Sequence, residues 1–273
     1  MSFFDLRGRC IPSPGMRLFQ ETQGDYYKIK SPIVDYESIL LRLKKFNHLS
    51  HSFSLIEFKD RAEQLISKLN ADENFTNILN GPHIPFICHS ESHFLDLGEN
   101  LENILLPQLH DSFVEKFPGH HFKSVNQAGI NLKGKINLES SSRYANFIQS
   151  AKKGPVVGWF FPQALQEFDI ASQRIQISKL PDLIDASFCL SGALDVCSAL
   201  IGIPELLINS ENYSPILCLS SYVHDDPRLV LLLKSYGPHM EFWCISQMLR
   251  NGVTQVSEQW SGGITVFDFF EYN

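Results

Sequence analysis

Apolar residues recur at helical spacing in the first third of the chain. After Asp35 they lie three and four positions apart, which is the period of an amphipathic helix with Asp35 as its N-cap. The tetrapeptide that begins at Ser54 has the pattern of a capping box and precedes a second apolar stripe. A third, short helix is expected over 72–79, ended by the turn residues up to Pro82. The pattern therefore predicts helices over residues 35–80.

From Pro82 onward the apolar residues form short runs bounded by turn residues, which is typical of buried strands. These runs predict strands at 84–88, 155–161, 174–177, 215–222, 229–236, 240–245 and 264–270. The last runs before residue 246 are separated by short turns and predict a three-stranded antiparallel meander. Residues 118–143 are rich in Gly, Asn and Ser and are expected to form a loop. Ser191 is expected to cap a helix that ends near Gly202.

The order of these elements indicates the fold class. The chain shows no internal repeat and no Pro/Gly/Ser-rich linker. We therefore predict one α+β domain, residues 1–273, with N-terminal helices followed by a mixed, largely antiparallel sheet and a C-terminal β-meander. Residues 35–80 form its helical lead-in, and residues 82–273 its sheet-containing core.

Five short motifs follow one another between residues 82 and 246. They are Ile84-Pro85-Phe86, Ile203-Pro204-Glu205-Leu206-Leu207, Cys218-Leu219-Ser220-Ser221, Asp225-Asp226-Pro227-Arg228 and Glu241-Phe242-Trp243-Cys244. This order resembles a family of uncharacterised bacterial proteins, a domain of unknown function. The resemblance implies the order of elements and a bacterial, intracellular setting, and it provides no functional residue.

Composition narrows the class of protein. Hydrophobic residues make up 44% of the 273 residues and aromatic residues 12%, which is enough for a buried core and excludes disordered and collagen-like chains. The chain has 23 basic and 30 acidic residues, a net charge of −7, which argues against a dedicated nucleic-acid binder. We expect neither a secretory signal nor a membrane span, and we predict a cytoplasmic protein. The six cysteines form no C-x-x-C pair, and the four that lie inside apolar runs are expected to behave as small hydrophobic residues.

Histidines provide the first candidate for chemistry. Six of the ten fall between residues 83 and 121, and we take His83, His89, His93 and His121 as candidate ligands for zinc or another divalent metal. The alternative is that they are loop and surface histidines beside a buried strand, because their spacing matches no recurrent ligand pattern. The phosphate-binding and dinucleotide motifs are missing, so no cofactor is expected.

Cys88 and His224 are the candidate catalytic residues. Cys88 could act as a thiolate nucleophile with a distant base such as His224, but a cysteine in an apolar run is usually inert. His224, Asp225 and Asp226 could perform acid–base work or bind a cation, or they could form the tip of a hairpin ahead of Pro227.

Two functions remain open. The first is a non-catalytic binding or regulatory protein with a protein partner or self-association, and without nucleic acid or membrane contacts. The second is a hydrolase that uses the histidines of 83–121, with a metal or with a cysteine nucleophile. The aromatic tail 269–273 is expected to pair in a sheet or pack on a partner.

Overall fold

The predicted N-terminal helices form where their capping residues indicate. The computed structural model describes residues 2–16, 26–47, 49, 53–89, 96–127, 129, 131–183, 186–208, 211–246, 249–250, 253–254 and 259–268. Helix α1 (Tyr36–Phe46) begins after Asp35, and α2 (Leu55–Ala71) begins after Ser54. Each capping side chain accepts a hydrogen bond from a backbone N–H of the first turn, as the sequence predicts. The third segment is a 3-10 helix, η1 (Thr76–Asn80).

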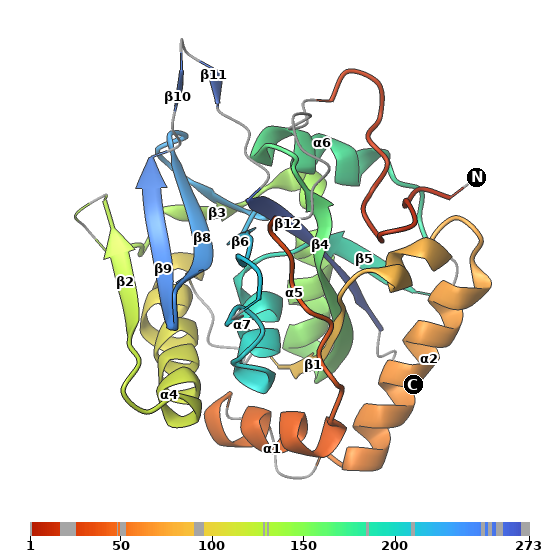
Figure 1. Cartoon of the computed structure of the whole chain (residues 1–273), viewed down its shortest axis with the longest axis horizontal. Helices are drawn as coiled ribbons and strands as arrows, with labels where there is room; N and C mark the ends of the chain where they lie inside the picture. Colours follow the sequence, from red (N-terminus) through yellow and green to blue (C-terminus); the bar gives the residue numbers. More distant parts are fainter. Residues whose placement is uncertain are drawn as a thin grey trace.

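Eight strands of the described residues build one mixed sheet (Figure 1). Its order is β1 (Ile84–Cys88), β4 (Val156–Gln166), β12 (Trp260–Phe267), β6 (Ile216–Cys218), β8 (Leu229–Tyr236), β9 (His239–Ser246) and β2 (Phe122–Asn126), and β5 (Ser187–Leu190) also pairs with β12. Among the strand pairs of this sheet in the described residues, only β12–β6 and β2–β9 are parallel. The α+β class is confirmed, and β6, β8 and β9 form the predicted meander.

Strand β12 is paired along both of its edges. One edge pairs with β4, while the other pairs with β6 at its start and with β5 from Ile264 onward. Two smaller pairs complete the strands: β3 (Ile136–Leu138) with β7 (Tyr222–His224), and β10 (Leu249–Arg250) with β11 (Val253–Thr254). The predicted strand at 264–270 is thus the second half of β12, and residues 269–273 lie outside the described part of the chain.

Helix α7 (Ala193–Gly202) is the central helix, and every one of its residues is buried. It packs on β1 and β4 and contacts α1 and α4 (Leu106–Lys116). The side chains of β8 separate by alternation: Leu231 and Leu233 enter this main core, whereas Val230 and Leu232 pack in a second cluster with Ile170. Both faces of the sheet therefore carry buried apolar side chains at β8.

Three local predictions were wrong. Residues 174–177 lie in a helix, α6 (Ile170–Lys179), because Asp169 caps it and its two buried isoleucines are seven positions apart. Residues 118–143 contain β2 and β3, whose partners β9 and β7 lie far along the chain. Gly192, rather than Ser191, is the N-cap of α7.

The remaining helices lie between β1 and β4 in the chain. Helix α3 (Leu97–Asn100) continues through one π-helical stretch, η2 (Leu101–Leu105), into α4. A short 3-10 helix, η3 (Ser140–Ser142), precedes α5 (Tyr144–Lys153), which packs against β5. None of the helices in the described residues is long and apolar enough to cross a membrane.

Candidate functional site

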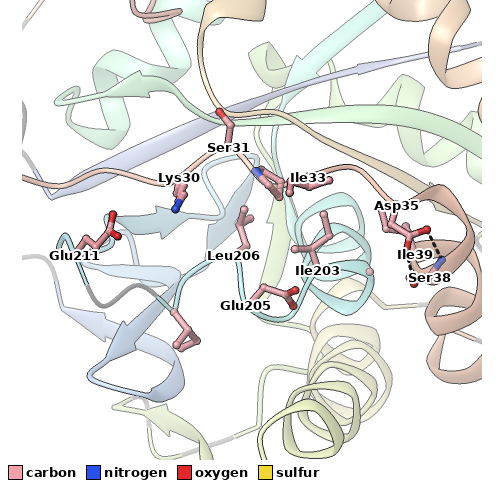
Figure 2. Close-up of a pocket in the computed structure, with 13 residues that line it drawn as sticks. Lys30, Ser31, Ile33, Asp35, Ser38, Ile39, Ile203, Glu205, Leu206 and Glu211 are labelled. Atoms are coloured by element: carbon pink, nitrogen blue, oxygen red, sulfur yellow. Dashed lines mark hydrogen bonds between the residues drawn. The ribbon is translucent and has the colours of Figure 1, made fainter.

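A groove of about 480 Å³ opens between three segments of the chain (Figure 2). These are an extended segment before α1, the start of α1 itself, and the residues that follow α7. The lining residues are Lys30, Ser31, Pro32, Ile33, Asp35, Ser38, Ile39, Gly202, Ile203, Glu205, Leu206, Ile208 and Glu211. The volume lies within the range of roughly 300–1,000 Å³ that is typical of ligand-binding pockets.

One wall of the groove belongs to residues 26–34, which we call the strap. The strap has no regular secondary structure, yet its backbone is held from inside the protein. Ile29 N–H donates to Gln163 Oε1 at 2.8 Å, and Gln166 Nε2 donates to the carbonyl of Tyr27 at 2.9 Å. Both glutamines lie on β4 and are buried, so these bonds satisfy polar groups on both sides. The strap is therefore fixed to the central sheet.

The floor of the groove is apolar and lies where α1 meets the end of α7. Ile39, Ile203 and Leu206 are all less than a tenth exposed. A Cβ on Gly202 would lie 2.9 Å from Ile39 Cγ2, so glycine at this position allows the close approach of the two helices. Arg42 of α1 donates from Nε to the carbonyl of Ile201 at 3.0 Å and satisfies one terminal carbonyl of α7.

The rim of the groove is acidic. Its charged groups are the carboxylates of Asp35, Glu205 and Glu211 and one ammonium group, that of Lys30. Figure 2 shows Asp35 and Glu211 at opposite ends, with the apolar floor between them. An apolar floor between carboxylates suits a ligand with an apolar body and a cationic group.

All three of these carboxylates interact with other groups of the protein. Both oxygens of Asp35 accept hydrogen bonds from Ser38, one from the backbone N–H at 3.1 Å and one from the hydroxyl at 2.7 Å. These bonds lower the pKa of Asp35 and keep it ionised. Glu205 Oε1 lies 3.5 Å from Lys116 Nζ, and both side chains are about half exposed, so water competes with that ion pair.

A second polar cluster surrounds Asp195 on α7, but it is closed to solvent. Asp195 Oδ1 accepts from the Tyr144 hydroxyl at 2.8 Å and from the Gly192 N–H at 3.0 Å, and its other oxygen accepts from the Thr265 hydroxyl. Burial raises the pKa of Asp195 to about 6. The side chains of Asp195, Tyr144 and Thr265 are fully buried. The cluster therefore connects the start of α7 to β12 and α5, and it offers no site to a substrate.

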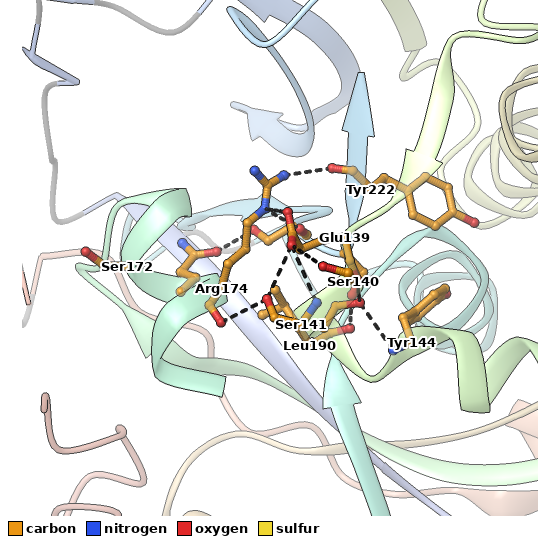
Figure 3. Close-up of polar contacts among 12 residues, drawn as sticks. Glu139, Ser140, Ser141, Tyr144, Ser172, Arg174, Leu190 and Tyr222 are labelled. Carbon is orange, nitrogen blue, oxygen red and sulfur yellow. Dashed lines mark hydrogen bonds and ion pairs between the residues drawn. The ribbon is translucent and has the colours of Figure 1, made fainter. Parts of the chain in front are cut away.

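Figure 3 shows a third cluster, centred on Arg174 of α6. The guanidinium donates to the carbonyls of Ser220 and Tyr222, each at 3.0 Å, and lies 3.7 Å from Glu139 Oε2. Burial lowers the pKa of Arg174, although Glu139 opposes the shift. These contacts connect α6 to the segment between β6 and β7 and give the cluster a structural role.

The candidate metal ligands do not converge. His83 and His89 flank β1, whereas His121 precedes β2, and these strands are the two ends of the sheet order. His83 Nδ1 lies 2.8 Å from the carbonyl of Gly81, and burial lowers the pKa of His83. His93 lies outside the described residues. Within the described part of the chain, no three His, Cys, Asp or Glu side chains are grouped as a metal would require.

His121 instead contacts a histidine that the sequence analysis did not connect with it. Its ring stacks on that of His239 with centroids 3.6 Å apart and planes 16° apart, and His120 meets the His239 ring edge-on at 5.7 Å. The His121 backbone N–H donates to His239 Nδ1 at 3.1 Å. The stack joins the start of β2 to β9. No local pattern could indicate it, because His239 is more than a hundred residues away.

Cys88 lacks the environment of a nucleophile. The residue is fully buried, and burial raises the pKa of its thiol well above the ordinary value. His224 is also buried, and its Nδ1 accepts from the Asp226 backbone N–H at 2.9 Å. Arg228 binds the Asp226 carboxylate and lowers its pKa to about 2. This geometry is that of a turn, which was the alternative interpretation of residues 224–227.

Comparisons with protein-family models, with curated proteins and with solved structures gave no match. The resemblance over residues 82–246 therefore stays a prediction. The groove was missed in the sequence analysis because its walls come from segments more than 150 residues apart, and the strap has no hydrophobic period. The residues after α7 were noted only as a motif of the resemblance.

Proposed function

We propose that this chain is a non-catalytic binding protein of the cytoplasm, and that the groove between the strap, α1 and the end of α7 is its binding site. The ligand is a segment of a protein partner that carries an apolar side chain next to a basic one. All six cysteines are free and buried, which suits a reducing compartment.

The observation that carries this proposal is an apolar floor with carboxylates on its rim. Ile39, Ile203 and Leu206 provide a surface for an apolar side chain, while Glu205 and Glu211 provide partners for a basic one. The walls are preorganised, because the strap is hydrogen-bonded to β4 and α1 packs directly on α7. Preorganised walls reduce the entropy lost on binding.

We do not propose the hydrolase. Cys88 is buried with a raised thiol pKa, and the described histidines of 83–121 lie on both ends of the sheet order. No arrangement among the described residues favours a nucleophile with a base.

The test uses two dipeptides of equal size and opposite charge, N-acetyl-Leu-Arg-amide and N-acetyl-Leu-Glu-amide. Each is titrated into the full chain while the methyl resonances of Ile39 and Ile203 are followed by NMR. The Arg dipeptide is expected to shift both methyl groups, with weak affinity and with a loss of binding at high salt. The Glu dipeptide is expected to leave them unchanged, because the rim repels it.

A double variant, Glu205→Gln with Glu211→Gln, should bind the Arg dipeptide about fivefold more weakly, since the attraction of two exposed carboxylates is removed. The matched control is Glu73→Gln, an exposed glutamate outside the groove, which should bind as the original chain does. Equal binding of both dipeptides, or shifts scattered away from the groove, would contradict the proposal. A change in mass by light scattering on titration would instead assign the effect to self-association.

A further inference from the structure

Three tyrosines gather beyond one end of the groove. The rings of Tyr26 and Tyr213 are stacked with centroids 5.9 Å apart and planes only 6° apart, and Tyr27 contacts both at 6.3 and 6.0 Å. Tyr26 is 65% exposed and Tyr213 is 67% exposed. We call Tyr26 and Tyr213 the tyrosine platform. Large aromatic rings are usually buried, as most are in this chain, so two parallel rings exposed to solvent are uncommon.

The platform is held in position by the backbone beneath it. Tyr27 and Tyr213 form a parallel β-bridge, and Lys28 N–H donates to the Tyr213 carbonyl at 3.0 Å. The carbonyl of Tyr27 in turn accepts from the buried amide of Gln166. The two exposed rings are therefore presented on a fixed backbone, and a ligand that stacks on them does not have to order the segment first.

The platform lies close to the groove along the chain. Along the strap, Lys30 lies three residues after Tyr27, and on the opposing segment Glu211 lies two residues before Tyr213. Because Tyr27 and Tyr213 are bridged, each of these two groove residues is separated from the bridge by at most three residues of chain, which span no more than about 11 Å. A ligand that contacts the rings and the groove together must be elongated, which excludes a compact amine.

The tyrosine platform has the chemistry that binds an extended proline-containing chain. A polyproline II segment has no internal hydrogen bonds, so its carbonyls are available to phenol hydroxyls, and its prolines pack on aromatic rings. Among the described residues, neither platform hydroxyl has a hydrogen-bond partner, so both can donate to such carbonyls. A basic residue further along the segment would meet the acidic rim.

On the basis of the proposed function, we infer that the partner segment is a proline-rich peptide with a basic residue, bound across the tyrosine platform and the groove. Its prolines pack against Tyr26 and Tyr213, its apolar side chain lies on the groove floor, and its basic side chain lies among the rim carboxylates. The net charge of −7 and the acidic rim oppose a nucleic acid or an anionic lipid surface as the occupant.

The experiment compares two fluorescein-labelled peptides, Pro-Pro-Leu-Pro-Arg-amide and Ala-Ala-Leu-Ala-Arg-amide, by fluorescence anisotropy with the full chain. The proline peptide is expected to bind at least tenfold more tightly than the alanine peptide. The double variant Tyr26→Ala with Tyr213→Ala should remove this tenfold advantage and leave binding of N-acetyl-Leu-Arg-amide unchanged. The matched control is Tyr236→Ala, which removes a ring of similar exposure, 70%, at the turn between β8 and β9.

Each outcome decides between the two proposals. If both peptides bind equally, or if the double variant keeps the preference for proline, the inference about the partner is wrong. The proposal that the groove binds a ligand is then decided by the dipeptide titration alone. If neither peptide nor the Arg dipeptide binds, both proposals fail. Should the double variant unfold, Tyr26→Ala alone is the second variant, because the backbone bridge belongs to Tyr27 and Tyr213. A retained proline preference in that variant overturns the inference.

Discussion

The buried carboxyl of Asp195 predicts an unusual dependence of stability on pH. Its pKa is about 6 in the folded protein because of burial, against about 3.9 in an unfolded chain. The folded state therefore binds more protons than the unfolded state between these two values. The contribution to stability is fully present below the unfolded pKa and is lost as pH rises through the folded pKa.

The magnitude follows from the shift of about two pKa units, since each unit corresponds to about 1.4 kcal/mol. The full loss is about 3 kcal/mol, of which about 2 kcal/mol falls between pH 4 and pH 7. The substitution Asp195→Asn removes this titration and keeps the shape of the side chain. Its Oδ1 can accept from Tyr144 and Gly192, and its amide can donate to the Thr265 oxygen, whose hydrogen can turn to Ser191 Oγ at 3.1 Å.

The assay is urea unfolding of both proteins from pH 4 to pH 7, followed by tryptophan fluorescence. The free energy of unfolding of the original chain, minus that of Asp195→Asn, should fall by about 2 kcal/mol across this range. The control is Asp226→Asn. Arg228 lowers the pKa of Asp226 to about 2, so this group stays ionised in the folded protein from pH 4 to pH 7, and its difference should rise slightly with pH instead of falling. Parallel curves for the original chain and Asp195→Asn would refute the reasoning.

Three further predictions concern the core. The Arg61 guanidinium binds the Asp268 carboxylate at 2.6 and 2.9 Å. Arg61→Ala removes this partner and should lower the free energy of unfolding in urea by about 3 kcal/mol. An unchanged urea midpoint would show that water solvates Asp268. Gly158→Ala would place a Cβ 2.6 Å from Phe86 Cζ, so overpacking should cost about 2 kcal/mol in the same assay, and a melting temperature equal to that of the original chain would contradict this. All six thiols are buried, so none should react with Ellman's reagent until denaturant is added, and one fast thiol in the native protein would contradict the structure.

The parts of the fold that the sequence predicted well are those stabilised by nearby residues. Helices α1 and α2 start at Asp35 and Ser54, where a side chain caps its own first turn. The meander of β6, β8 and β9 follows from short turns between apolar runs. Helix α6 was mistaken for a strand because four residues of an apolar pattern do not separate the two periods.

The pairing of β2 with β9 could not be predicted in the same way. The two strands are parallel and distant in sequence, so no turn between them records the contact. The candidate ligands show the same limit. His83 and His121 look close along the chain, yet β1 and β2 are the two ends of the sheet order, and the ring that His121 contacts belongs to β9.

The sequence by itself determined the α+β class, the capped N-terminal helices, the meander and the burial of the cysteines in apolar runs, because these depend on hydrophobic period and on short-range hydrogen bonds. Tertiary structure alone decided the proposed binding surface. The strap forms a wall of the groove only because two buried glutamines of β4 hydrogen-bond its backbone, one as acceptor and one as donor. Tyr26 contacts Tyr213 only because the backbone bridge joins segments that are far apart in the chain. Such contacts join residues that are distant in sequence, and no hydrophobic periodicity in the sequence indicates them.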